Sequence, residues 1–416
     1  MFKITNRFIY SFIIFISPVF LVLLLLFRKK KIIRVWGITA NRIGHFAGNV
    51  EMFINSNSGK EYEKYFNICY FKGKICNEFL ANKWRGKLVV LPFQIIYPFH
   101  RLLIYLSNRF PIFNEHIVYD PPIFSRDYNN YIDKLKPTLS FKKHEIEKAE
   151  KLLKEFGLKK NDKYVCFIVR DSEYLKKNYP NNDWSYWNYR DYDIDKFLPA
   201  AEELTKLGFH VFRMGKICKK KFNSKNKMII DYAFSKNKSD FLDIYLGATC
   251  EFCLTTDVGY DHIPYIFRRP IASITDPISL MKLSSRQFLN IFSCYYNISE
   301  KRCLTIDEIF KKNLAYFEDE KHPINNGIKL IKPNPNDIKK FVIDMVNYIN
   351  NDFKLNQEDE ENNKSFFKIY DKNIKSSNFK NMFKSKFDNK INKLHNNYCG
   401  RISPTFLSEK KKLIDL

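Results

Sequence analysis

Several well-known catalytic signatures are missing from this sequence of 416 residues. It has no GxxxxGK(S/T) phosphate loop, no HExxH zinc motif, no GxSxG elbow and no protein-kinase signature, which argues against those chemistries. The carboxylates Asp257, Asp261 and Asp276 do not have the spacing of a DxD metal motif. We therefore predict no metal site.

A cysteine framework is also lacking. The nine cysteines follow no regular spacing, which predicts reduced thiols rather than a set of disulfides. Cys250 and Cys253 have CxxC spacing, but they lead into an apolar strand and no second ligand pair lies nearby. We expect buried structural thiols there rather than a zinc or redox site.

Acidic residues are scarce relative to basic ones, with 45 Asp and Glu against 70 Lys and Arg and a net charge of +25. This excess indicates either an anionic partner or a codon bias toward Lys, and composition alone does not separate the two. Apolar residues make up 45% of the chain and aromatics 16%, which excludes a disordered polyelectrolyte. The length predicts two ordinary domains with additional segments.

The N-terminus carries an apolar run without charge at residues 8–27. A helix over this run would span roughly 30 Å of hydrocarbon. Basic residues follow it directly, from Arg28 to Lys31, where a cleaved signal would have small residues. We therefore predict an uncleaved, single-pass inner-membrane anchor with the bulk of the chain in the cytoplasm, and the alternative is a buried core helix.

Short apolar runs alternate with longer helical patterns through most of the remaining chain, which predicts an α/β protein with parallel sheets. We expect four regions along the chain. They are the anchor with its basic flank at 1–31, a Rossmann-like domain at 32–142, a second Rossmann-like domain at 143–351, and a polar tail at 352–416 in which 400–407 can dock back.

Ligands in open α/β sheets bind beyond the carboxyl ends of strands, so the residues that follow each strand are candidates. The first predicted strand, Ile32–Thr39, leads into Arg42, Gly44 and His45, with Glu51 in the helix after them. The glycine lets a ligand approach the backbone, and His45 or Glu51 can accept a proton. The alternative is an ordinary strand-to-helix turn with a capping histidine.

Strands of the second block end in charged and hydroxyl residues that suit phosphate recognition. These strand-end candidates are Arg170, Asp171, Arg213, Gly215, Asp231, Thr255, Thr256 and Gly259. The helix after Gly259 offers free N–H groups to a diphosphate. The alternative for each arginine is a salt bridge between domains.

An aromatic-rich loop follows Asp171, and Tyr189 and Arg190 lie near its end. Its rings can stack on a nucleobase or a sugar. A hydrophobic plug under a lid is the alternative.

These segments also carry a family resemblance, which extends over about 33–407. The motifs are RIGHFAGNVE, VRDSEY, YRD, LTKLGFHVFRMG, IIDYA, SDFLDIYLGA, TTDVGYDHIP and GRISPTFL. Together they resemble a little-characterised bacterial family assigned to glycosyl transfer and encoded with surface-polysaccharide genes. The resemblance implies a GT-B-like fold, in which two Rossmann-type β/α domains face a cleft.

The resemblance also implies roles for individual residues. His45 and Glu51 would face the acceptor. The residues that would hold the nucleotide-sugar donor are Arg170, Asp171, Arg213, Gly215, Thr255, Thr256, Gly259 and His262. Asp231 stays a further candidate for the cleft, as do Arg42, Gly44, Tyr189 and Arg190. It implies no cofactor, because the donor is a substrate, and the acceptor would be a lipid-linked saccharide at the membrane. The alternatives are a non-catalytic, membrane-tethered scaffold of a polysaccharide assembly complex and, lowest in rank, a nucleic-acid-binding protein. We expect no nucleic-acid partner, because the lysines are scattered and no recognition motif is present.

Overall fold

The computed structural model describes residues 15, 17–118, 127, 129–276, 280–315, 317, 319–374 and 398–411. The chain forms two compact units, Met1–Ser125 and Arg126–Leu416. The predicted boundary between the two Rossmann-like domains lies after residue 142. Residues 126–142 belong instead to the second unit, where the Asp133 carboxylate accepts a hydrogen bond from the backbone N–H of Arg286 at 2.9 Å.

The first unit is built on a parallel sheet with the strand order β3-β2-β1-β4. Its strands are β1 (Ile32–Thr39), β2 (Tyr65–Lys72), β3 (Val89–Val90) and β4 (Ile117–Val118). The range of β1 is the one predicted. Because β2 and β3 lie on one side of β1 and β4 on the other, the chain changes direction at β1, as in a doubly wound fold.

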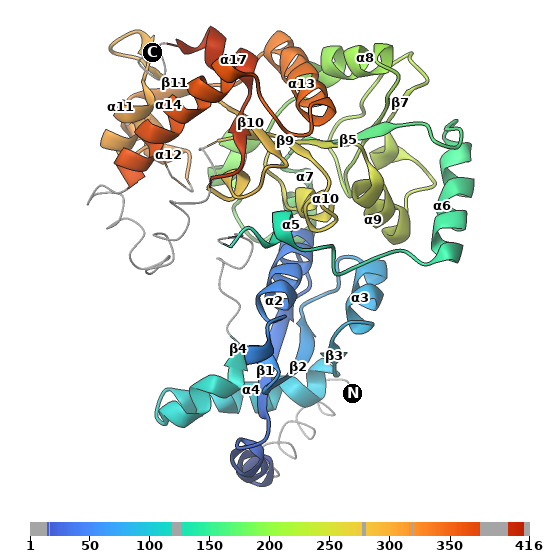
Figure 1. Cartoon of the computed structure of the whole chain (residues 1–416), viewed down its shortest axis with the longest axis vertical. Coiled ribbons are helices and arrows are strands. Elements are labelled where there is room, and N and C mark those ends of the chain that lie inside the picture. Colours follow the sequence, from blue (N-terminus) through green and yellow to red (C-terminus); the bar gives the residue numbers. More distant parts are fainter. Residues whose placement is uncertain are drawn as a thin grey trace. The chain divides into compact units, whose positions relative to one another are not determined.

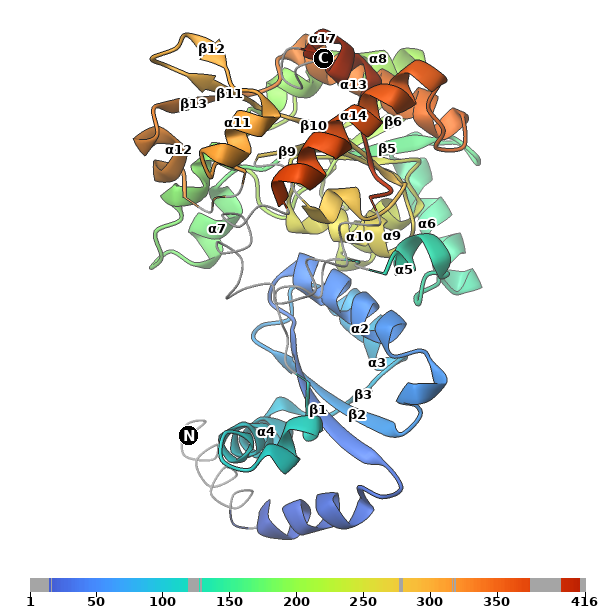
Figure 2. The same cartoon turned by 60° about the vertical axis from the view of Figure 1, so that its left-hand side comes forward.

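Helices connect these strands and cover the sheet (Figure 2). They are α2 (Val50–Ser56), α3 (Glu78–Arg85) and α4 (Phe93–Ser107), with a π-helical turn at His45–Asn49 before α2 and a 3₁₀ turn at Pro111–His116 after α4. A helix over residues 17–27 precedes β1. Its Leu24 packs into the core of this unit with Val35, Ile96 and Leu103.

Within the described residues, no helix is both long enough and apolar enough to cross a membrane. Residues 1–14 and 16, which include the first part of the predicted anchor, lie outside the described residues.

The second unit contains a larger parallel sheet with the order β14-β10-β9-β8-β5-β6-β7. Its strands are β5 (Tyr164–Ile168), β6 (His210–Arg213), β7 (Ile229–Ile230), β8 (Cys253–Thr255), β9 (Ile271–Thr275), β10 (Phe288–Phe292) and β14 (Arg401–Ile402). Strands β5 and β9 are buried along their whole length, as is typical of central parallel strands; β5 is continuously apolar, and β9 includes the buried Ser273 and Thr275. The direction of winding reverses between β5 and β8, which lie side by side.

Helices lie on both faces of this sheet (Figure 1). Near its centre, α8 (Leu198–Lys206) and α13 (Pro335–Asn350) pack together on one face, and α9 (Asp240–Thr249) and α10 (His262–Ile266) pack together on the other. The remaining helices that precede β9 are α5 (Tyr131–Lys134), α6 (Lys143–Glu155) and α7 (Glu173–Asn178). Both units therefore have the predicted α/β architecture with parallel sheets.

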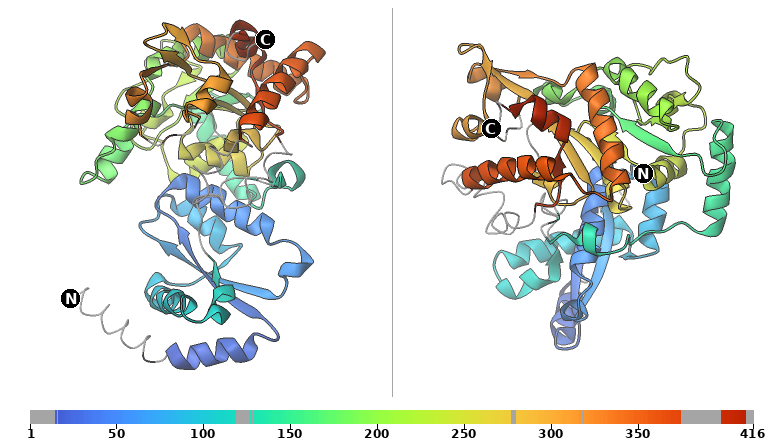
Figure 3. Two further views of the ribbon diagram at one scale, coloured as in Figure 1. Left: turned by 90° about the vertical axis from the view of Figure 1, so that its left-hand side faces the viewer. Right: turned by 45° about the horizontal axis from the view of Figure 1, so that its top comes forward.

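The C-terminal region differs from the predicted polar tail. Residues Gln357–Ile374 form helix α14, followed after the gap at 375–397 by β14 and α17 (Pro404–Glu409). Figure 3 shows α13, α14 and α17, in orange and red, gathered on the second unit. The side chain of Asn363 on α14 bonds the N–H and the C=O of Ile402, and β14 pairs with β10. The segment at 400–407 therefore docks on the sheet, as the sequence analysis allowed.

A small antiparallel sheet was not foreseen. It has the order β12-β11-β13, formed by β11 (Cys294–Asn297), β12 (Arg302–Cys303) and β13 (Ile328–Ile331), with α11 (Ile306–Lys311) and α12 (Lys321–Asn325) beside it. Cys294 and Cys303 are joined by a disulfide across β11 and β12, with their Cα atoms 6.0 Å apart. The expectation that all cysteines are free thiols was wrong at this pair, because the antiparallel hairpin brings the two together. Cys250 and Cys253 are buried free thiols, as predicted.

Candidate functional site

The strongest candidate site lies where β5 and β8 end in the second unit. Thr256 follows β8, and Arg170 follows β5. The backbone N–H of Arg170 donates to the Thr256 side-chain oxygen at 2.8 Å, and the N–H of Thr256 donates to the Ile168 carbonyl at 3.2 Å. These bonds fasten two segments that are far apart in the sequence at the position where doubly wound sheets bind ligands.

The Arg170 side chain is buried in this corner, with 8% of it exposed. Its Nη1 donates to the Trp187 carbonyl at 3.0 Å and pairs with the carboxylate of Asp191. Its Nη2 is buried and has no hydrogen-bond partner among the described residues. A buried donor without an acceptor costs about 1 to 3 kcal/mol, so a ligand oxygen at this nitrogen would be favourable.

A second arginine holds the turn after β8. Asp257 has a φ of +56°, which is uncommon for any residue other than glycine and marks local strain. Arg190 donates to the Asp257 carbonyl and lies 3.3 Å from its Oδ2. Lys282 Nζ lies 3.6 Å from the other carboxylate oxygen. Burial, with a smaller contribution from the positive charge of Arg190, lowers the pKa of Arg170 to about 10.

Lys332 joins this group, although the sequence gave no sign of it. It follows β13, donates to the Asp191 carbonyl, and lies with its Nζ 4.3 Å from the centre of the Tyr192 ring. Burial lowers the pKa of Lys332, and nearby cations that include Arg170 act in the same direction. Only the antiparallel sheet brings this residue to the carboxyl edge of the parallel one. We call Arg170, Arg190, Asp191, Thr256, Asp257 and Lys332 the switch-point cluster.

Asp276 contacts the segment that follows Asp191 of the switch-point cluster. It follows β9, is buried, and accepts hydrogen bonds from the Tyr192 hydroxyl at 2.7 Å and the Ser293 N–H at 2.9 Å. Burial raises the pKa of its carboxyl group. Asp276 therefore anchors the segment that carries Asp191 to the central strands.

Arg213, which was predicted to bind phosphate at the end of β6, holds the following loop through hydrogen bonds. The Arg213 side chain is 1% exposed, and it donates to Asp231 Oδ1 at 3.2 Å and to the Lys220 carbonyl at 3.1 Å. Asp231 also accepts from the Phe222 N–H at 2.8 Å. Arg213 is the last residue of β6, which pairs with β5, and Lys220 and Asp231 supply partners to both of its terminal nitrogens, while its buried Nε has no partner among the described residues.

Asp171 and Gly215 also contribute to the structure of the loop after β6. The Asp171 carboxylate accepts from the N–H groups of Glu173 and Lys219, both at 3.0 Å. A Cβ at Gly215 would collide with the sulfur of Cys218. The strand-end prediction thus separates into the switch-point cluster, in which Arg170 Nη2 has no partner among the described residues, and a group of residues that fastens the loop after β6.

The turn after Thr256 does not contain the helix N-terminus expected there. Gly259 begins a 3₁₀ turn, Gly259–Asp261, and α10 has five residues, which gives it little dipole. Thr255 is buried and donates to Asp261 Oδ2 at 3.1 Å. His262 Nδ1 lies 3.0 Å from Asp261 Oδ1. Thr255 and His262, which were predicted to bind the nucleotide-sugar donor, therefore both contact Asp261.

Asp261 forms a buried ion pair with Lys282, which the sequence analysis also missed. The atoms are 2.7 Å apart and both side chains are 1% exposed. Burial alone would raise the pKa of Asp261, but the charge of Lys282 holds it at about 2. This pair braces the turn that carries Thr256 and Asp257.

The aromatic loop packs mainly on itself. Trp184 and Trp187 stack with their ring centres 5.5 Å apart, and Tyr186 lies against Trp187 at 5.0 Å. The Tyr189 hydroxyl donates to the Phe317 carbonyl at 3.3 Å, and burial raises the pKa of Tyr189 to about 12. These contacts fit the plug described above better than a stacking platform.

In the first unit, the predicted proton acceptors differ in exposure. His45 begins the π-helical turn and is half-buried, with its Nδ1 3.2 Å from the Asn49 side-chain nitrogen. Glu51 lies in α2, is fully buried and accepts from Asn55 at 3.2 Å. Single π-turns are frequent at functional sites. Of the two, His45 is the one that a substrate can reach.

The other two candidates of this unit precede the π-turn. Arg42 is half-buried, and its carbonyl accepts from the Phe46 N–H at 2.9 Å. Gly44 is buried directly before His45. Both therefore lie in the turn that connects β1 to the helix, as the sequence analysis expected of a ligand-approach loop.

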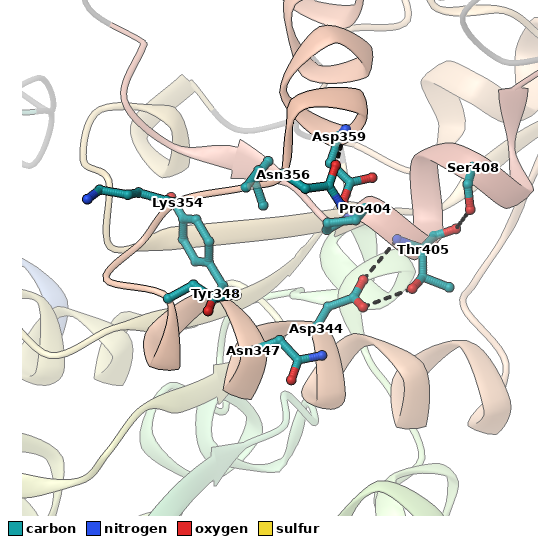
Figure 4. Close-up of a pocket in the computed structure, with 11 residues that line it drawn as sticks. Asp344, Asn347, Tyr348, Lys354, Asn356, Asp359, Pro404, Thr405 and Ser408 are labelled. Carbon is teal, nitrogen blue, oxygen red and sulfur yellow. Dashed lines mark hydrogen bonds between the residues drawn. The ribbon is translucent and has the colours of Figure 1, made fainter.

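A separate pocket of about 390 Å³ lies between α13, α14 and α17 (Figure 4). None of the predicted site residues lines it. Its carboxylates already have partners, because Asp344 accepts from the N–H and hydroxyl of Thr405, and Asp359 bonds Asn356. This pocket is thus a weaker candidate than the switch-point cluster.

No family model matches the chain, and no curated protein does either. Among solved structures, it is similar to a family 9 glycosyl transferase from Veillonella parvula, with 11% identity over 60% of this chain and 81% of that one and a TM-score of 0.37. It is similar to ADP-heptose LPS heptosyltransferase II of E. coli, with 14% identity over 60% and 86% and a TM-score of 0.34. It is also similar to an E. coli heptosyltransferase with ADP, with 11% identity over 63% of this chain and 91% of that one and a TM-score of 0.31. Because these TM-scores lie below 0.5, the doubly wound assignment rests on the strand orders of the two units.

Proposed function

We propose that the second unit binds the diphosphate of a nucleotide sugar at the switch-point cluster, and that the protein is a glycosyltransferase. The observation that carries this proposal is the buried, unpartnered Nη2 of Arg170 at the end of β5, beside Arg190 and Lys332. Three cations in a partly desolvated corner suit an anion with several oxygens. A diphosphate has this form.

The chemistry follows from the same groups. When a glycosidic bond to a diphosphate breaks, negative charge develops on the leaving oxygen. Arg170 and Lys332 would stabilise that charge through preorganised donors, without a divalent metal. For the proton of the acceptor hydroxyl we propose His45, the more accessible of the two predicted acceptors. For the acceptor itself we propose a lipid-linked saccharide at the cytoplasmic membrane face.

Calorimetric titration of the full chain with UDP, GDP, CDP and ADP tests the donor site. We expect one of them to bind, and Arg170→Gln and Lys332→Met each to weaken it by about 10- to 100-fold, as a charge-assisted hydrogen bond of about 1.5 to 3 kcal/mol predicts. Arg302→Gln is the matched control, because Arg302 is an exposed arginine paired with Glu300 and Glu308 on the small sheet.

Two results would contradict the proposal. One is binding that survives both Arg170→Gln and Lys332→Met in proteins that melt normally. The other is a chain that none of the four nucleotides binds or protects against heat, which would favour the non-catalytic scaffold. Transfer of label from the matching nucleotide sugar to a membrane lipid extract then tests the acceptor class.

A further inference from the structure

The helix at residues 17–27 packs on the first unit along one side. Leu24 is 5% exposed and lies in a core cluster with Val35, Ile96 and Leu103. Phe20 contacts Phe99 of α4, with ring centres 6.1 Å apart. Figure 2 shows the helix beside α4. A helix that buries one side in a protein core has only its other side available for a partner.

That other side is strongly apolar. Phe15 is 82% exposed and Leu26 is 69% exposed. The further exposed large apolar residues of this segment are Val19, Val22, Leu23, Leu25 and Phe27. Soluble proteins rarely leave a contiguous apolar surface of this kind without an interaction partner.

Helix α4 and the 3₁₀ turn after it extend this surface. Ile95 and Tyr105 of α4 and Phe110 and Ile112 beyond it are exposed. The sequence of α4 contains no Asp or Glu. The guanidinium of Arg109 lies 4.3 Å from the Tyr105 ring, an arrangement in which an aromatic side chain and a cation share one surface.

The positive charge beside this apolar surface indicates which kind of partner binds to it. Lys29, Lys30 and Lys31 lie just after the helix and are exposed, and Arg101 and Arg109 are exposed on and beside α4. Arg28 is exposed as well, but it pairs with Glu115, the acidic residue of the 3₁₀ turn at Pro111–His116, so these two charges offset each other. A second copy of this chain would bring the same cations against each other. A bilayer surface with anionic headgroups instead offers an apolar interior and negative charge, and each nearby Lys or Arg strengthens such binding.

We propose that the first unit docks on an anionic lipid surface through a face formed by residues 17–31, α4 and the 3₁₀ turn at Pro111–His116. This docking face adds α4 and the turn to the predicted anchor and places the helix in the plane of the interface. It does not depend on the switch-point cluster, because none of its residues belongs to the second unit.

Flotation of the full chain with vesicles tests the proposal. We expect binding to vesicles that contain phosphatidylglycerol, at least tenfold weaker binding to pure phosphatidylcholine, and weakening by salt. The triple variant Ile95→Ser, Tyr105→Ser and Ile112→Ser on the α4 side should lower binding about tenfold, and Lys29→Gln with Lys30→Gln should lower it severalfold. Ile324→Ser and Phe234→Ser change exposed apolar residues of the second unit and serve as controls.

Three outcomes would overturn it. In the first, the α4 variant binds as the wild type does while its thermal melt is unchanged. In the second, phosphatidylcholine and phosphatidylglycerol vesicles bind equally well. In the third, the chain forms dimers through this face without lipid. Nucleotide titration of the same variants separates this result from the donor proposal, because docking variants should leave nucleotide affinity unchanged.

Discussion

The backbone N–H of Arg170 donates a hydrogen bond of 2.8 Å to the side-chain oxygen of Thr256. This bond ties the ends of β5 and β8 together at the point where the winding of the sheet reverses. It fixes the backbone from which the buried Arg170 side chain extends. The position of the unpartnered guanidinium nitrogen thus depends on a hydroxyl that follows a different strand.

Replacing Thr256 tests this dependence. Thr256→Val keeps the shape of the side chain but leaves the Arg170 N–H without its acceptor, so we expect a loss of about 1 to 3 kcal/mol in unfolding free energy. We also expect weaker nucleotide binding, because Arg170 is no longer held. Urea unfolding and calorimetry measure the two effects. Thr256→Ser retains the hydroxyl and should behave as the wild type does; equal losses in both variants would refute this role.

The buried pair of Lys282 and Asp261 predicts a reversal of pH dependence. Lys282→Met leaves a buried carboxylate unpaired, which should cost about 3 to 5 kcal/mol at pH 7. In the wild type, the Asp261 pKa of about 2 lies below its ordinary 3.8, so its stabilisation is present above pH 3.8 and lost as pH falls toward 2.

In Lys282→Met, burial would raise the pKa of Asp261, so stability should increase as pH falls from 7 to 5. Urea midpoints at the two pH values measure this change. Lys206→Met removes an exposed lysine paired with Glu203 and should shift the midpoint little. A Lys282→Met protein with wild-type stability at both pH values would mean that the pair is not a brace.

His100 predicts an acid-sensitive first unit. Its Nδ1 lies 3.0 Å from the Tyr70 hydroxyl, and burial, with a smaller contribution from Lys72, lowers its pKa from 6.5 to about 4. The unfolded chain therefore binds the proton more readily. Stability is complete above pH 6.5 and decreases as pH falls to about 4, by up to about 3 kcal/mol at about 1.36 kcal/mol per pH unit.

His100→Asn should flatten the stability profile between pH 6.5 and 4, as followed by urea unfolding at several pH values. His144 is exposed on α6, so His144→Asn should leave the profile as it is. If both variants keep the wild-type slope, another group causes the acid loss.

Gly400 tests the docking of the C-terminal segment. A Cβ at this position would lie 2.7 Å from the Lys282 carbonyl and 3.0 Å from Leu283 Cα, which are backbone atoms that cannot turn away. Gly400→Ala should therefore destabilise the second unit by about 1 to 3 kcal/mol, as measured by thermal unfolding. At Gly59 the nearest atoms belong to the flexible end of the Glu61 side chain, so Gly59→Ala should be nearly neutral. An unchanged melt for Gly400→Ala would mean that this close approach is not maintained in solution.

The sequence by itself determined the α/β class and the edge of the sheet at which the candidate binding residues lie. The segment Ile32–Thr39 is apolar apart from Arg34 and Thr39 and is mostly buried in the sheet, so its pattern alone marked the strand. Arg170 and Thr256 were predictable candidates for the same reason, because residues that follow parallel strands meet at one edge. The same rule also selected Arg213, which follows an equally apolar strand.

Tertiary structure decided which hydrogen-bond partners each of these arginines has. Asp231 and the Lys220 carbonyl bind the two terminal nitrogens of Arg213 and leave its Nε without a partner, whereas in Arg170 it is a terminal nitrogen, Nη2, that has no partner among the described residues. Lys282 lies in a 3₁₀ turn and Lys332 follows a strand of the antiparallel sheet, so the rule for the ends of parallel strands selects neither residue. The alternation of apolar and polar residues along the chain encodes local structure, whereas tertiary packing sets the partners of a side chain across the fold. The burial and the neighbouring charges that change the pKa values of Arg170 and Asp261 therefore arise only in the folded protein.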